Sequence, residues 1–170
     1  MVKAANRRGI AQVKRKKPTK AQIMKPMKKH HANEKQKRDI LSKLVKILKV
    51  EASPVFAYAY GSFVKNNGFN DIDIGIYLAE GHFQSDDALF KYGLRLAAKV
   101  DLAIEGYEVD VQTLNFAPLS FRFRVINTGR LLFSKDERQR IEFETRTRDF
   151  YFDFLPHRRL LYRKMVLGEE

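Results

Sequence analysis

Three aspartates are the residues of this chain best suited to chemistry. Asp71 and Asp73 stand one residue apart in the apolar run "DIDIGIYL", and Asp110 stands in a later run, "YEVDVQTL". Side chains alternate along a strand, so we expect Asp71 and Asp73 to share one face, with Asp110 pointing away from its valine neighbours. If the two strands lie side by side, the three carboxylates meet.

Three neighbouring carboxylates repel one another, and each raises the pKa of the others. A divalent cation removes this repulsion, and hard oxygen ligands suit Mg²⁺. We therefore predict that Asp71, Asp73 and Asp110 bind Mg²⁺ and serve phosphoryl transfer. A D-x-D pair by itself is more often the exposed polar face of an edge strand, so the prediction needs a second feature.

The second feature is a glycine turn just before the aspartate pair. Gly61 and Ser62 end the apolar run "VFAYAYG", where a strand gives way to a turn or a helix start. Glycine lets the backbone approach a ligand, and free N–H groups with a Ser hydroxyl can hold phosphate oxygens. Lys65 can add a positive charge. The turn would hold a triphosphate and the aspartates the metal that bridges to it.

The predicted elements follow one another in the order helix, strand, strand, helix, strand, helix, strand, helix, which predicts a mixed α/β domain. Ser53-Pro54 ends a first amphipathic helix, which begins at Asp39 or earlier, near Glu34. The other predicted elements are strands at 55–61, 71–78, 107–114 and 131–133, helices at 86–103 and 118–127, and a helix from Asp136 that Pro156 breaks or kinks.

The helix expected at 86–103 is amphipathic, with Ser85 or Asp86 as its N-cap. Its apolar positions, which we expect to face the core, are Leu89, Phe90, Leu94, Ala97, Ala98 and Leu102.

Charge divides the chain into a basic tail, residues 1–38, and a neutral domain, residues 39–170. The tail has 14 Lys or Arg and one acid, Glu34, whereas the domain has 19 basic and 19 acidic residues. The tail is expected to be flexible, because like charges repel and few large apolar residues offset chain entropy. It could contact nucleic acid through phosphates, remain solvated without a partner, or result from a translation start upstream of Met24 or Met27.

The quoted motifs resemble the DNA polymerase beta-like nucleotidyltransferase superfamily. Its signature is Gly-Ser, a loop, Asp-x-Asp between apolar residues and a third Asp on a later strand. The small size points to the minimal nucleotidyltransferases (MNT), which in prokaryotes are often encoded beside a HEPN protein as the antitoxin of a toxin–antitoxin pair. The segments "LN.AP" after Asp110 and "D...R" from Asp136 add to this resemblance, which covers about residues 40–156.

The resemblance implies a role for each site residue. Gly61, Ser62 and Lys65 would contact the nucleotide phosphates. Asp71 and Asp73 would bind Mg²⁺, and Asp110 would complete the metal site and help deprotonate the attacking hydroxyl. The reaction would be transfer of AMP from ATP to a Tyr of the HEPN partner, silencing its RNase activity.

Two features depart from the family pattern. Asn66 and Asn67 precede Gly68, where the family often has Gly directly after the basic residue. The loop between Ser62 and Asp71 is also short, at eight residues. A rival interpretation is a binding protein that uses the basic tail on RNA or a ribonucleoprotein and keeps the nucleotidyltransferase-like fold as a scaffold. Transfer to a small molecule ranks low, because no second domain builds a pocket for one.

Other features carry weaker expectations. His30 and His31 are expected in the solvated tail, His82 in an exposed loop, and His157 on a charged helix face with Arg158, Arg159, Arg163 and Lys164. The aromatic run "FYFDFL" is expected in the core or at a partner interface. The chain has no Cys and no apolar run long enough for a membrane span, so we expect a cytoplasmic protein.

Overall fold

The structure is a computed structural model that describes residues 29–162, 164–165 and 168. Its elements are β1 (His30–His31), α2 (Glu34–Val50), β2 (Pro54–Tyr60), α3 (Ser62–Lys65), β3 (Gly68–Phe69), β4 (Ile72–Leu78), the 3-10 turn η1 (Glu80–His82), α4 (Asp86–Ala103), β5 (Val109–Thr113), α5 (Leu119–Thr128), β6 (Arg130–Ser134) and α6 (Glu137–Tyr162). The predicted mixed fold, a small sheet flanked by helices, is confirmed.

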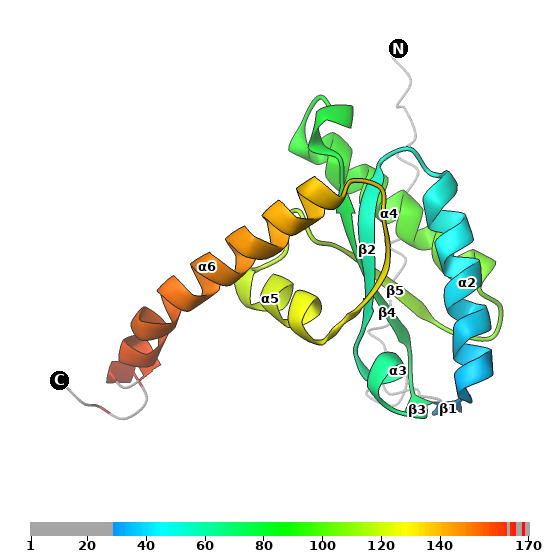
Figure 1. Cartoon of the computed structure of the whole chain (residues 1–170), viewed down its shortest axis with the longest axis horizontal. Helices are drawn as coiled ribbons and strands as arrows, with labels where there is room; N and C mark the ends of the chain where they lie inside the picture. Colours follow the sequence, from blue (N-terminus) through cyan, green and yellow to red (C-terminus); the bar gives the residue numbers. More distant parts are fainter. Residues whose placement is uncertain (1–28, 163, 166–167, 169–170) are drawn as a thin grey trace, which may run out of the picture.

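The central sheet has four strands in the order β5-β4-β2-β6. β2 runs antiparallel to both β4 and β6, while β4 and β5 are parallel. Helices α2 and α4 cover one face of this sheet, and α5 and α6 lie on the other (Figure 1). α6 continues well beyond the sheet, so its C-terminal half projects from the body of the domain (Figure 1).

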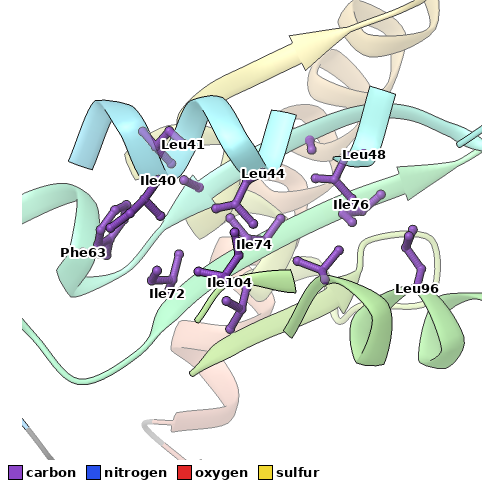
Figure 2. Packing of buried hydrophobic residues seen from close by; sticks show 14 of the residues in the cluster. Ile40, Leu41, Leu44, Leu48, Phe63, Ile72, Ile74, Ile76, Leu96 and Ile104 are labelled. Carbon is purple, nitrogen blue, oxygen red and sulfur yellow. The ribbon is translucent and has the colours of Figure 1, made fainter. Parts of the chain in front are cut away.

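The main core lies between the sheet and α2 with α4. Alternate residues of β4, Ile72, Ile74 and Ile76, are almost fully buried there, which leaves Asp73 on the opposite face. Leu44 and Leu48 of α2 close over these isoleucines (Figure 2). Burying each such aliphatic side chain contributes roughly 1.5–3 kcal/mol, so the alternation sets the orientation of the aspartates firmly.

A second core holds α5 and α6 against the sheet. Phe56 and Tyr58 of β2 pack there with Val125 of α5, and Phe56 stacks on Tyr77 at a centroid distance of 4.9 Å. The Tyr58 hydroxyl donates to Glu144 of α6. Glu144 also accepts from Arg140 at 2.5 Å and Arg148 at 3.0 Å, so α6 is anchored by a polar cluster as well as by apolar contacts.

The "LN.AP" segment fastens the end of β4. The Asn115 side chain accepts from Leu78 N and donates to Leu78 O, both at 2.9 Å. Arg122 of α5 donates from Nε to Ala117 O at 2.8 Å and also reaches Asn115 O. These contacts give the segment a structural role, which fixes where α5 starts relative to β5.

The first helix begins at the earlier of the two expected positions. Asn33 caps α2 by accepting from Gln36 N at 2.9 Å, and the Gln36 side chain accepts in return from Asn33 N at 2.8 Å. This capping box satisfies two free N–H groups at the helix start. Asp39 therefore lies inside the helix and is not its cap.

The expectation that His30 lies in a solvated tail is wrong. β1 pairs antiparallel with β3, placing His30 opposite Phe69. The His30 ring stacks on Phe69 at 5.8 Å and contacts Tyr107 at 5.1 Å. Residues 30–38 thus belong to the folded part, although we expected the folded domain to begin at residue 39. Residues 1–28 of the predicted tail lie outside the described residues.

The expected core face of α4 is only partly correct. Its buried residues are Leu89, Gly93, Leu96 and Val100. Phe90, Leu94 and Leu102 are 53%, 57% and 83% exposed. Helical spacing identifies an apolar stripe, but packing against β5 selects which side of the stripe faces the core.

The remaining expectations about elements are largely confirmed. α6 runs through Pro156 without ending there. His82 and His157 are exposed, whereas the side chains of Arg158, Arg159 and Arg163 lie outside the described residues.

In the aromatic run of α6, Tyr151 stacks on Phe123 at 3.7 Å, while Phe150, Phe152 and Phe154 are about half exposed. No helix in the described part of the chain has the length and apolar character that a membrane crossing requires.

Candidate active site

The parallel pairing of β4 and β5 brings Asp73 and Asp110 side by side. In the register of these strands Asp73 lies directly opposite Asp110, at the interstrand spacing of about 4.8 Å. Asp71 lies two residues before Asp73, immediately ahead of the first residue of β4, Ile72. All three aspartates belong to the sheet face that carries α5 and α6, as the alternation of side chains predicts.

The glycine turn reaches the same place from the other side of β4. Tyr60, the last residue of β2, pairs with Asp73, and Gly61 follows it at φ +76°. A β-carbon on Gly61 would overlap Asp73 Oδ2 and lie 3.0 Å from Asp73 Cγ. Only glycine therefore fits at this position, both for its backbone conformation and for its contact with the carboxylate.

The carboxylates act on one another electrostatically. Partial burial, followed by the negative charges of Asp71 and Asp110, raises the pKa of Asp73 to about 6. Arg124 of α5 opposes this rise. The region is therefore short of positive charge, as expected for a site that receives a cation.

Tyr60 and Arg124 border the carboxylates. Burial and the charges of Asp73 and Asp110 raise the pKa of Tyr60 far above its usual value, so its hydroxyl stays neutral. Tyr60 meets Phe121 edge to face at 5.5 Å, and the Arg124 guanidinium lies over the Phe121 ring at 5.2 Å. The Arg124 side chain is exposed, which leaves its donors free to bind an anion.

A side-chain amide orients Asp110. Gln112 Nε2 donates to both carboxylate oxygens of Asp110, each at 3.2 Å. Both residues lie on one face of β5, two positions apart, and both are exposed. Asp110 thus keeps the solvent access that a proton acceptor needs.

Ser62 and Lys65 occupy the two ends of the short helix α3. Gly61 is the N-cap position of this helix, so the predicted change from strand to helix start is confirmed. Ser62 is half-buried and Lys65 is exposed. Among the described ion pairs none involves Lys65, and its predicted contact with phosphate remains a prediction.

The donor set fits a hard divalent cation. Three carboxylates on one face offer the oxygen ligands that Mg²⁺ prefers, together with unbalanced negative charge. Nevertheless, within the described residues no group of three Asp, Glu, His or Cys side chains is arranged as a ready-made metal site. That these residues bind Mg²⁺ therefore stays a prediction.

Sequence analysis did not identify Tyr60, Gln112 or Arg124 as site residues. Tyr60 could have been found, because the residue before Gly61 opposes Asp73 once the two strands pair. Arg124 carries no such signal. Arg122 and Arg124 stand two residues apart in "FRFRVIN", yet Arg122 binds backbone carbonyls and Arg124 borders the aspartates.

Comparison with known families gives a match over more than half of the chain. Residues 42–138 match the family described as "Polymerase beta, Nucleotidyltransferase", a range that includes Gly61, all three aspartates and Arg124. No curated protein was found to match the chain.

Solved structures with a similar fold include toxin–antitoxin complexes. In the complex of the tri-AMPylated HEPN toxin of Shewanella oneidensis with its MNT antitoxin, the matching chain is 20% identical, with a TM-score of 0.55, covering 75% of this chain and 97% of that one. A toxin–antitoxin structure with AMP-PNP gives 20% identity, a TM-score of 0.56 and coverage of 73% and 96%. The MntA-HepT toxin–antitoxin structure gives 20% identity and a TM-score of 0.54, and the match covers 75% of this chain and 97% of that one. At this identity the likeness shows the fold.

Proposed function

The chain belongs to the polymerase beta nucleotidyltransferase family, and on that basis we propose that it transfers AMP from ATP to a protein hydroxyl. The acceptor we propose is a Tyr of a HEPN ribonuclease, which the transfer would silence, so that the chain acts as an antitoxin. One solved structure of similar fold contains an AMPylated HEPN toxin, and another contains AMP-PNP. Both support this choice of nucleotide and acceptor.

The observation that carries the proposal is the meeting of Asp73 and Asp110 beside Gly61. Two residues that are far apart in the chain become strand neighbours through a parallel pairing, and the glycine turn abuts the same carboxylate. A surface pair of aspartates would need neither the third carboxylate nor the close approach of the backbone.

Each residue then has a distinct task. Asp71, Asp73 and Asp110 would hold Mg²⁺, which supplies charge neutralisation at the transferring phosphorus when bound. Gly61 and Ser62 would present backbone N–H groups and a hydroxyl to the phosphates. Lys65 and Arg124 would add positive charge around the triphosphate.

The proposed reaction balances without any further reactant. Asp110 accepts the proton of the acceptor hydroxyl, whose oxygen attacks the α-phosphorus of ATP. The bond between the α-phosphorus and the bridging oxygen breaks, and pyrophosphate leaves with that oxygen. Gln112 keeps the Asp110 carboxylate oriented toward the acceptor.

The test is co-expression with a HEPN protein, followed by intact-mass measurement of that protein. We expect the mass of the HEPN protein to increase by that of one or more AMP groups, and this increase to require Asp71 and Asp73. The double variant Asp71→Asn plus Asp73→Asn removes charge with little change in volume, and its thermal melting serves as the control for folding. AMP transfer by the folded double variant would rule out this mechanism.

A further inference from the structure

An apolar groove opens beside Asp110 on the side of the site away from Gly61. Its cavity is about 420 Å³, within the roughly 300–1,000 Å³ typical of ligand pockets. We call this cavity the acceptor groove. The residues that line it include Phe90, Leu94, Asp110, Thr113, Phe116 and Phe121.

The apolar walls of the acceptor groove are not used by the core. Phe90, Leu94 and Phe116 are 53%, 57% and 46% exposed, although helical spacing places the first two on the apolar stripe of α4. At the floor, α4 approaches the sheet so closely that a β-carbon on Gly93 would lie 2.5 Å from Thr113 Oγ1. The groove is therefore formed by the close packing of α4 on β5.

The groove also exposes main-chain hydrogen-bonding groups. β5 is an edge strand, and within the described residues it pairs with β4 alone. Ile72 N donates to Glu108 O at 2.9 Å and Leu114 N to Ile76 O at 2.7 Å, so the even-numbered residues of this parallel strand face β4. The N–H and C=O groups of Val111 and Thr113 consequently point to the open edge, in the lining of the groove.

The groove and the glycine turn lie on opposite sides of Asp73. Asp110 is on β5, Asp73 on β4, and Gly61 follows β2, so the sheet order separates the two. Phosphoryl transfer places the attacking and leaving oxygens roughly in line through the phosphorus. If the triphosphate lies at Gly61, the attacking hydroxyl arrives from the side of Asp110, where the groove ends.

The lining selects a class of acceptor. None of the described residues that line the groove is Lys or Arg, and Asp110 adds negative charge, so the lining itself offers no cation to a nucleic-acid backbone; Arg124, over the Phe121 ring, is the cation that borders it. An extended polypeptide, by contrast, can pair with a free strand edge and place alternate side chains in an apolar pocket.

Resting on the proposed function, we infer that the acceptor groove binds an extended apolar polypeptide segment whose Tyr hydroxyl reaches Asp110. The segment adds to the open edge of β5 as a further strand. Its apolar side chains pack between Phe116 and Leu94.

The probe is a library of synthetic peptides with a central Tyr and varied flanks, offered to the full chain with Mg²⁺ and ATP. We expect the labelled peptides to be rich in aliphatic and aromatic residues and poor in Pro. Methylating the backbone nitrogens of a selected peptide one at a time should weaken binding at alternate positions, because only every second N–H faces β5. Uniform tolerance of methylation would overturn the strand pairing.

Variants of the groove walls test its side chains. We expect Leu94→Ser plus Phe116→Ser to weaken binding of the same peptide, with Phe in place of Tyr, by about tenfold or more. Leu102→Ser, an exposed leucine of the same helix outside the groove, is the matched control and should bind normally. Unchanged peptide binding in the double variant, equal loss of affinity for an ATP analogue, or labelling of RNA in place of peptide would each overturn the inference.

The same measurements separate the two proposals. Peptide binding that depends on the groove but occurs without AMP transfer would defeat the proposed function and leave the groove assignment standing. AMP transfer to a protein hydroxyl that is indifferent to Leu94 and Phe116 would do the reverse.

Discussion

Gly61 packs directly against the carboxylate of Asp73. The glycine lies at φ +76°, and a β-carbon there would overlap Asp73 Oδ2. This contact links the end of β2 to Asp73, one of the three site aspartates. The proposed phosphate turn is therefore packed directly against a proposed metal ligand.

Gly61→Ala should therefore reduce both stability and activity. The backbone of Gly61, at φ +76° and ψ −156°, lies in a region almost restricted to glycine, so a residue with a β-carbon there costs on the order of 1–3 kcal/mol, and the overlap adds to this cost while displacing Asp73. Gly106→Ala is the matched control, since Gly106 also has a positive φ, +86°, but open space around it. Urea unfolding should show a larger loss for Gly61→Ala, and only this variant should lose AMP transfer. Equal losses in the two variants would show that the contact with Asp73 is unimportant.

Ionisation of Asp73 should destabilise the metal-free protein. Its pKa is about 6 in the folded chain, owing to burial and to Asp71 and Asp110, whereas an unfolded Asp has a pKa of about 3.9. Between these values the folded state binds more protons, so the free energy of unfolding falls as the pH rises from about 4 to 6. Tyr60 stays neutral in this range.

Asn cannot ionise, so in the Asp73→Asn variant the free energy of unfolding should fall less between about pH 4 and 6 than in the native chain. Urea midpoints at pH 4.5, 5.5 and 7 in the presence of a chelator measure the difference between the two proteins. If Mg²⁺ binds as proposed, it should raise the melting temperature of the native chain more at pH 7 than at pH 5, because protons compete for Asp73. Parallel pH profiles for the native chain and Asp73→Asn would contradict the assignment.

Arg124→Gln should weaken binding of an ATP analogue by about tenfold, the effect of losing one charge-assisted hydrogen bond of roughly 1.5 kcal/mol. Arg124 borders Asp73, whereas Lys65, the cation that the sequence motif suggests, lies at the end of α3; both side chains are exposed. Lys65→Gln provides the direct comparison, and Arg130→Gln, at an exposed position on β6, the control. A loss confined to Lys65→Gln would return the phosphate contact to the motif residue.

Deletion of residues 1–28 should remove any nucleic-acid binding without lowering the melting temperature. These residues hold 10 Lys or Arg and no acid, so binding through them should weaken steeply with salt. Deletion of residues 1–38 should also lower the melting temperature, because it removes the capping box of α2 and uncovers Phe69. Nucleic-acid binding that survives the shorter deletion would place the contact in the folded domain.

Local sequence patterns predicted the order of the main helices and strands and the orientation of the aspartates. Ile72, Ile74 and Ile76 alternate with Asp71 and Asp73, and a period of two is a local property of an extended chain. The cap at Ser85 and the glycine turn at Gly61 are local signals of the same kind.

Which residues meet in space depends on how the elements pack, and this could not be read from local patterns. The pairing of Asp73 with Asp110, the approach of Arg124 and the docking of His30 on Phe69 each join segments that no local period relates. The exposure of Phe90 and Leu94 likewise follows from how α4 packs on β5. Periodicity tells which residues share a face of an element, whereas the packing of one element on another decides what that face touches.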